Sequence, residues 1–204
     1  MNREGHWNSI YRAKGEDAVS WFEAQPSISL ELLDAAGMTA ETCVVDIGGG
    51  ESRLVDALLA KGMDCLAVLD VSDAALQHAQ DRIGAASQAV VWLHTDVTGQ
   101  WSLKPMDIWH DRAVFHFLTD AAARAGYLAH LRETLKADGS VIIATFAPDG
   151  PERCSGLPVV RYSAESLAQE LGEGFILEQW RPHRHMTPWG AVQAFQYSLF
   201  RRVH

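Results

Sequence analysis

The chain has 204 residues, is 48% hydrophobic, and carries a formal net charge of −9 with a pI near 5.4. This acidic balance argues against general affinity for nucleic acid or for an anionic membrane surface, because both need a basic face. The chain has no apolar run of 18 residues, and its polar start lacks the apolar core of a secretion signal, so we expect a cytoplasmic protein of one domain.

Two N-terminal segments, 6–13 and 28–36, have apolar residues at helical spacing. From residue 43 onward, strand and helix patterns alternate. The expected strands are 43–47, 64–70, 89–94, 107–111 and 140–146, and the expected helices between them are 52–61, 74–83 and about 120–136.

Beyond residue 146 the regular alternation of strand and helix patterns ends. A loop rich in proline and glycine, 147–161, precedes a helix at 163–172 and two strands near 174–182 and 191–202. Alternating strands and helices predict an α/β fold with a doubly wound, Rossmann-like sheet of seven strands. The sheet should be mostly parallel and should end in an antiparallel C-terminal hairpin.

The three cysteines, Cys43, Cys65 and Cys154, are widely spaced. We expect Cys43 and Cys65 to be small core residues of strands, with no disulfide framework. Cys154 lies in the Pro/Gly-flanked loop, where its thiol should be more exposed than the other two. A metal site built from Cys154, His183 and His185 has no supporting ligand spacing, so no metal is predicted.

The stretch Asp46-Ile47-Gly48-Gly49-Gly50 ends a buried strand and leads into a helix. Glycines allow positive φ and let a ligand approach bare backbone, and the next helix starts with unpaired N–H groups. A glycine-rich turn is a weak signal alone, because a tight turn that binds nothing has the same composition.

Four expected strands end in or just before an aspartate: Asp46, Asp70, Asp96 and Asp111. Open parallel sheets bind ligands outside the carboxyl ends of their strands. Unpaired buried carboxylates are costly, so four of them on one edge suggest a polar ligand along that edge. Asp96 is placed to accept from the exocyclic amine of an adenine ring, with Val97 packed beside it.

Asp70 carries the most specific meaning, because it follows Gly50 by 20 residues at the end of the second strand. A carboxylate at that place can accept both hydroxyls of a ribose. The alternative is a helix cap, which Ser72 and Asp73 already provide.

These motifs together resemble the class I S-adenosylmethionine-dependent methyltransferases over residues 43–146. Further likeness lies in Val68–Ser72, His94–Val97, Met106–Arg112 and the turn Leu135–Ser140. The resemblance implies S-adenosyl-L-methionine as cofactor, with Gly48 and Gly50 behind its methionine part and Asp111 near its amine. The implied cofactor residues are Asp46, Gly48, Gly49, Gly50, Asp70, Val71, Asp96, Val97, Asp111 and Arg112, with Trp7 and Tyr11 from the N-terminal segment.

The chain departs from the family pattern at Ser52, which stands at the third small position, after Glu51. A dinucleotide site, and with it an NAD(P)-dependent oxidoreductase, is a weaker alternative. Its third glycine would fall on Arg53, which is bulky and charged. A further alternative is a sensor or partner module that binds the cofactor without turnover.

The resemblance implies a single methyltransferase domain over 1–204, divided into a helical lid at 1–37, a cofactor core at 43–146 and a substrate side at 147–204. The entry segment is similar to a branch that contains protein-lysine methyltransferases. The acceptor is expected to be a small molecule or a protein side chain. Nucleic acid is not expected, because the chain lacks an Asn/Asp-Pro-Pro-aromatic motif after the fourth strand.

Methyl transfer needs alignment more than a dedicated base. His116 is the candidate for orienting or deprotonating an acceptor, and the alternative is a satisfied histidine on a helix face. Candidate substrate residues are Trp21, Cys154, Tyr162 and His185. For the N-terminal aromatic residues, core packing of a lid is an equal alternative. The sequence leaves the oligomeric state open.

Overall fold

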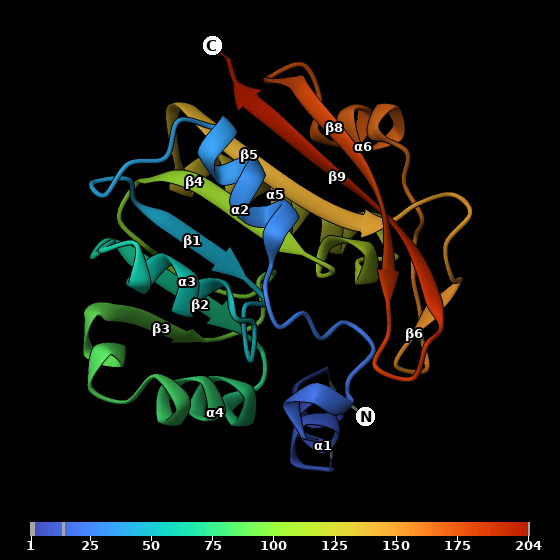
Figure 1. The fold of residues 1–204 in the computed structure, drawn as a ribbon. Helices are drawn as coiled ribbons and strands as arrows, with labels where there is room; N and C mark the ends of the chain where they lie inside the picture. Colours follow the sequence, from blue (N-terminus) through green and yellow to red (C-terminus); the bar gives the residue numbers. More distant parts are fainter. Residues whose placement is uncertain (1–2, 14, 204) are drawn as a thin grey trace.

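In the computed structural model, which describes residues 3–13 and 15–203, these residues form a seven-stranded sheet in the order β3-β2-β1-β4-β5-β9-β8 (Figure 1). The first five strands are parallel, and β9 runs antiparallel to both of its neighbours. The strands are β1 (Val44–Ile47), β2 (Leu66–Asp70), β3 (Val90–His94), β4 (Met106–Arg112), β5 (Leu135–Phe146), β8 (Phe175–Met186) and β9 (Val192–Arg202). The predicted fold class is confirmed.

The helices lie close to their predicted places, and capping residues explain several boundaries. The Ser72 hydroxyl accepts from the N–H of Ala75 at the start of α4, and Gly84 ends that helix with φ of 65°. The helices are α1 (Arg3–Ala13), α2 (Ser27–Ala35), α3 (Leu54–Ala60), α4 (Asp73–Ile83), α5 (Ala121–Thr134) and α6 (Ala164–Leu171), with 3-10 turns η1 (Glu16–Ala18), η2 (Gly84–Ala89) and η3 (Phe115–Phe117). Among the described helices, none is long and apolar enough to cross a membrane.

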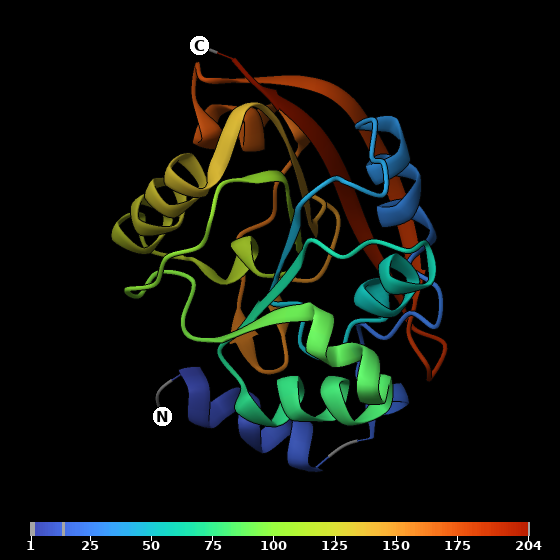
Figure 2. The same ribbon diagram turned by 90° about the vertical axis from the view of Figure 1, so that its left-hand side faces the viewer.

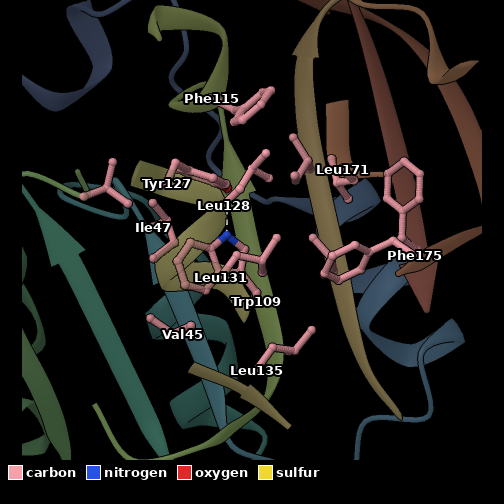
Figure 3. Packing of buried hydrophobic residues seen from close by; sticks show 14 of the residues in the cluster. Val45, Ile47, Trp109, Phe115, Tyr127, Leu128, Leu131, Leu135, Leu171 and Phe175 are labelled. Atoms are coloured by element: carbon pink, nitrogen blue, oxygen red, sulfur yellow. Dashed lines mark hydrogen bonds between the residues drawn. The ribbon is translucent and has the colours of Figure 1, made fainter. Parts of the chain in front are cut away.

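The sheet buries an apolar core on each face. On one face α5 and α6 pack over the strands, and on the other α2, α3 and α4 do so (Figure 2). Figure 3 shows the first core, where the indole N–H of Trp109 donates to the Tyr127 hydroxyl at 2.7 Å. Both side chains are fully buried, so this bond satisfies two polar atoms that burial would otherwise leave unpaired.

The structure differs from the expectations for the start of β5 and for the loop 147–161. Strand β5 begins at Leu135 instead of Ser140, because Leu135 pairs with Met106 across a shift in register. The loop 147–161 contains a small hairpin of β6 (Arg153–Cys154) and β7 (Leu157–Pro158).

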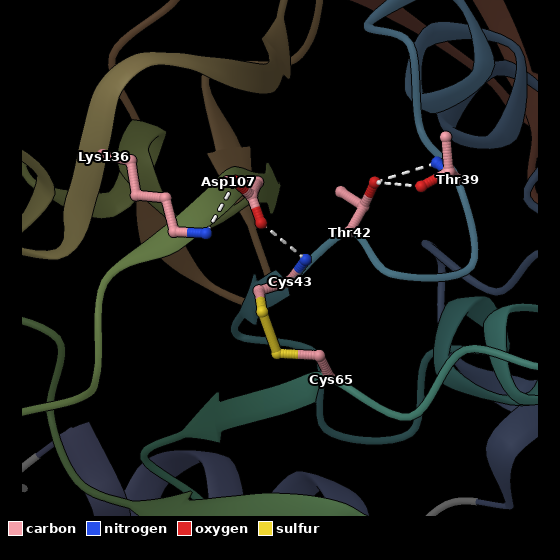
Figure 4. Close-up of a disulfide and its surroundings, with 6 residues drawn as sticks. All are labelled: Thr39, Thr42, Cys43, Cys65, Asp107 and Lys136. Atoms are coloured by element: carbon pink, nitrogen blue, oxygen red, sulfur yellow. Dashed lines mark hydrogen bonds and ion pairs between the residues drawn. A yellow bond between two sulfur atoms is a disulfide. The ribbon is translucent and has the colours of Figure 1, made fainter.

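The prediction about the cysteines was also wrong. The parallel register pairs Val44 with Leu66, so Cys43 and Cys65 come to lie side by side with their Cα atoms 4.6 Å apart, and they form a disulfide (Figure 4). Cys154 is buried, with 6% exposed, because the β6–β7 hairpin packs it against the second core.

Candidate functional site at the carboxyl edge of the sheet

A cavity opens where the parallel strands end, beneath the N-terminal helix α1. We call it the main cavity. This is the edge where an open parallel sheet binds its ligand. Its walls are Arg3, Trp7, Tyr11, Trp21, Gly48, Leu69, Asp70, Val71, Asp96, Val97, Arg112, Ala113, Val114, Phe117, Leu118 and Cys154. Most of the predicted cofactor residues are therefore brought together in one place, as are Trp21 and Cys154.

The glycine turn is tightly packed by the protein itself. Gly48 has φ of 65°, and a Cβ there would lie 2.0 Å from Cγ2 of Val114. A Cβ on Gly50 would lie 2.7 Å from a carboxylate oxygen of Asp70, and one on Gly49 would lie 2.6 Å from a carboxylate oxygen of Asp46. Glycine is required here so that the turn can pass close to the ends of the strands.

Asp70 is the most perturbed acid in the main cavity. It is 5% exposed, and burial raises its pKa to about 7, although the backbone N–H of Ser72 donates to Oδ1 at 2.8 Å. The charge of Asp46 adds to the increase. A buried carboxylate of this kind is stabilised by further donors, such as a pair of hydroxyl groups.

Asp96 connects the cavity to α1. Its carboxylate accepts from Nη1 of Arg3 at 3.1 and 3.3 Å and from the N–H and hydroxyl of Thr98 at 2.9 and 2.7 Å. Partial burial opposes ionisation, but these hydrogen bonds outweigh it and lower the pKa of Asp96. Asn8 also docks the helix, because its side-chain oxygen accepts from the Ser72 hydroxyl at 2.6 Å. Helix α1 thus covers the main cavity.

Aromatic rings form another part of the wall of the main cavity. Trp7 packs edge-on against Trp21 and Phe117, with ring centroids 5.6 and 5.1 Å apart, and lies 6.4 Å from Tyr11. Burial, followed by the charge of Asp70, raises the pKa of Tyr11 well above its usual range, so its phenol stays protonated. This wall is apolar and suits a planar or cationic group.

The end of β4 is strained and anchors the N-terminal segment. Ala113 follows the strand with φ of 70°, a conformation that is unusual for a residue with a Cβ and that marks many functional sites. Beside it, Arg112 donates from Nη1 to the carbonyl of Trp21 at 2.8 Å and from Nε to the hydroxyl of Tyr197 at 2.9 Å. Its Nη2 lies 3.0 Å from Oε1 of Glu23.

A second, smaller cavity shares Tyr11, Trp21, Gly48 and Arg112 with the main cavity. It is lined by a chain of buried, hydrogen-bonded polar groups, which includes two residues that the sequence analysis did not identify, His110 and Ser29. Nδ1 of His110 lies 2.7 Å from Oδ1 of Asp46, and Nε2 lies 2.9 Å from the Ser29 hydroxyl. Asp46 and His110 are partners in the parallel strands β1 and β4, and this pairing could have indicated their contact. The pairing can be recognised only once the register of the two strands is known.

Asp46 lines this second cavity together with Gly49. Oδ2 of Asp46 is buried and finds no hydrogen-bond partner among the described residues. A donor on a ligand would satisfy it, so a cofactor contact of Asp46 stays a prediction.

The structure does not bring His116 to either cavity. The side chain is fully buried between Phe117 and Phe146, and Nδ1 accepts from the N–H of Phe146 at 3.3 Å. Burial, with a smaller effect from the charge of Arg112, lowers the pKa of His116 to about 3. His116 is therefore a neutral core residue, and the predicted orienting or basic role is not supported.

Asp111 and Tyr162 also lie in the core instead of the cavities. The Asp111 carboxylate accepts from the Tyr127 hydroxyl at 2.7 Å and from the N–H groups of Val114 and Phe115 at 2.9 and 3.1 Å. Its side chain thus holds the turn after β4, and only its backbone remains a candidate for ligand contact. Tyr162 is 3% exposed and packs on Phe115.

Two further predicted substrate residues, Cys154 and His185, are not brought together in one cavity. Cys154 lines the main cavity, and burial raises its pKa to about 11, so it is a thiol at neutral pH. His185 lies outside the residues that line the two cavities and donates from Nε2 to the carbonyl of Ser20 at 2.7 Å. Glu23, instead of Cys154, joins His183 and His185 in a compact cluster.

Comparison with known proteins agrees with this geometry. Residues 45–141 match the family model described as a methyltransferase domain. None of the curated proteins is significantly similar to the chain.

Several solved structures share the fold. The 1,6-didemethyltoxoflavin-N1-methyltransferase of Burkholderia thailandensis, with bound S-adenosylhomocysteine, is 21% identical over 98% of this chain and 87% of its own, with a TM-score of 0.76. The N-methyltransferase NodS of Bradyrhizobium japonicum, also with S-adenosylhomocysteine, is 15% identical over 97% and 98%, with a TM-score of 0.72. A putative methyltransferase of Haloferax volcanii, in complex with the Trm112 activator, is 15% identical over 100% and 98%, with a TM-score of 0.76.

The sheet order, the glycine turn and the family match agree with one another. Residues 45–141 are similar to a methyltransferase domain, and the chain shares the fold of methyltransferases that were solved with S-adenosylhomocysteine.

Proposed function

We propose that the protein transfers a methyl group from S-adenosylmethionine to a small molecule or a protein side chain in the main cavity. The observation that carries this proposal is the meeting of Asp70, Asp96 and Gly48 in one cavity beneath the aromatic wall. The cavity fits an adenosine group, because Asp70 offers a buried acceptor for ribose hydroxyls and Val71 and Val97 offer apolar contacts for a ring. When bound, the cofactor supplies a methyl group on a positively charged sulfur.

The chain's own residues would bind, orient and exclude water. Trp7, Trp21 and Phe117 form a wall that suits a cation, because the faces of aromatic rings attract positive charge. Helix α1 covers the cavity, so the acceptor would meet the methyl group away from bulk water. His116 faces the core and Cys154 is a protonated thiol, so neither supports a base or nucleophile in this proposal.

The test is a turnover assay with the purified protein and S-adenosylmethionine labelled on its methyl group. Incubation with fractionated small molecules and with protein extract should release S-adenosylhomocysteine and label one fraction. Asp70→Asn should weaken cofactor binding and reduce this release.

The alternative, a sensor or partner module, predicts saturable cofactor binding without release of S-adenosylhomocysteine in any fraction. Absence of thermal stabilisation by the cofactor would reject both readings, since any ligand that binds only the folded state raises the melting temperature.

A further inference from the structure

Two histidines and a glutamate form a cluster beside the cavities. His183 and His185 lie two residues apart on β8, so their side chains emerge on the same face of the strand. Glu23 comes from the segment between η1 and α2. Nδ1 of His185 and Nε2 of His183 lie 3.5 and 3.7 Å from Oε1 of Glu23, and the three ligand atoms lie within 4.8 Å of one another.

These separations are those of ion pairs, and they are also close to the separations between the ligand atoms of one metal ion. Bonds of about 2.0–2.1 Å in a tetrahedral shell place ligand atoms about 3.4 Å apart. The two separations from Glu23 are already near that value. The two histidine nitrogens, which lie within 4.8 Å of each other, need to approach by about 1.4 Å at most to fit the same shell.

The tautomer of His185 is also set for ligation. Nε2 lies 2.7 Å from the carbonyl oxygen of Ser20, which can only accept, so Nε2 carries the proton. In the neutral ring, Nδ1 then presents its lone pair toward Glu23. Metal-bound histidines commonly donate their other N–H to a carbonyl in this way, because the bond fixes the ring and its tautomer.

The charges around the cluster permit a cation. Nη2 of Arg112 lies 3.0 Å from Oε1 of Glu23, and this neighbouring charge opposes cation binding. However, Arg112 also donates to Trp21 and Tyr197, and a single carboxylate oxygen has two lone pairs, so Oε1 of Glu23 can face both Arg112 and a cation. The ligand side chains are sheltered, with exposures of 4% for His185, 17% for Glu23 and 31% for His183.

We propose that Glu23, His183 and His185 bind one divalent transition-metal ion, Zn²⁺ foremost. Two imidazoles and one carboxylate suit zinc with a fourth, open position, whereas Mg²⁺ and Ca²⁺ prefer shells of oxygen. The ligands come from the N-terminal segment and the C-terminal hairpin. Zinc therefore joins these two parts of the chain and holds Trp21 over the main cavity.

The experiment is calorimetric titration of Zn²⁺ into untagged full-length protein that has been stripped of metal by a chelator. One ion per chain should bind, and the melting temperature should rise by on the order of 5 °C at free zinc about 100 times the Kd. His183→Ala, the least buried ligand change, and Glu23→Gln should each weaken zinc binding by about 100-fold or more. Mg²⁺ should produce no comparable heat.

Two variants serve as controls. His94 forms a similar pair, with Nε2 3.5 Å from Oε1 of Glu4 and no third ligand among the described residues, so His94→Gln should leave zinc affinity unchanged. Cys154→Ser should also leave it unchanged, because its sulfur is outside the cluster. Circular dichroism and cofactor binding report whether His183→Ala remains folded.

Failure to bind zinc with a Kd below about 100 µM, or binding that persists in the folded double variant of Glu23 and His183, would overturn the proposal. Equal loss in the His94 control would assign the binding to scattered surface histidines and overturn it as well. These readouts need no turnover, so they are independent of the proposed methyl transfer.

Discussion

If Asp70 binds the ribose of the cofactor, as we propose, its raised pKa should make cofactor binding depend on pH. Ribose hydroxyls donate to an ionised carboxylate, so the cofactor should bind the ionised form of Asp70. With a pKa of about 7, Asp70 is ionised in about a tenth of the molecules at pH 6 and in about nine tenths at pH 8. Cofactor affinity should therefore rise about 10-fold over this range, with release of about 0.9 proton per cofactor at pH 6 and about 0.1 at pH 8.

Calorimetry in two buffers of different ionisation enthalpy measures the cofactor affinity and the number of protons released on binding. Asp70→Asn should bind more weakly and lose the pH dependence. Asp96→Asn is the matched control: Asp96 lines the same cavity, but its pKa is lowered, so this change should weaken binding equally at pH 6 and pH 8. Constant affinity of the unchanged protein across this range, with no proton release at pH 6, would refute the assignment of Asp70 to the ribose.

The same pKa has a consequence for stability without the cofactor. The folded-state pKa of Asp70 lies above its unfolded value, so ionisation of this buried acid destabilises the fold. The loss should begin above about pH 4 and be complete above about pH 7, where it amounts to about 4 kcal/mol. Denaturant unfolding at pH 5 and pH 8, compared between the protein and Asp70→Asn, measures it.

Three other expected results concern the turn, the disulfide and the lid. Gly48→Ala should destabilise the fold by about 1–3 kcal/mol and reduce cofactor affinity, because the new Cβ meets Val114. Gly37 also has positive φ but has open space around it, so urea unfolding of Gly37→Ala measures the cost of positive φ alone. Reduction of the disulfide that precedes β1 and β2, which closes a 22-residue separation, should lower the free energy of unfolding by about 3 kcal/mol. A difference under about 0.5 kcal/mol, which is within the error of such measurements, would contradict this expectation. Arg3→Ala should change stability by less than about 1 kcal/mol and raise cofactor affinity severalfold, because Arg3 occupies the Asp96 carboxylate; weaker binding in calorimetry would instead make Arg3 part of the site.

Local sequence patterns determined the elements and the cofactor edge of this protein. Alternation of apolar strands with amphipathic helices is a property of neighbouring residues, and it predicted the mixed seven-stranded sheet. The glycine turn and Asp70 could be placed at the same edge from the sequence, because the carboxyl ends of parallel strands must meet at one edge.

Tertiary structure decided everything that depends on register or on contacts between distant segments. Cys43 and Cys65 looked like core residues until the parallel pairing placed them side by side. His116 sits next to the expected site in sequence, yet its 3-10 turn directs it into the core. Glu23 meets His183 only because the N-terminal segment packs against the last hairpin, and periodicity within one element carries no information about such a meeting.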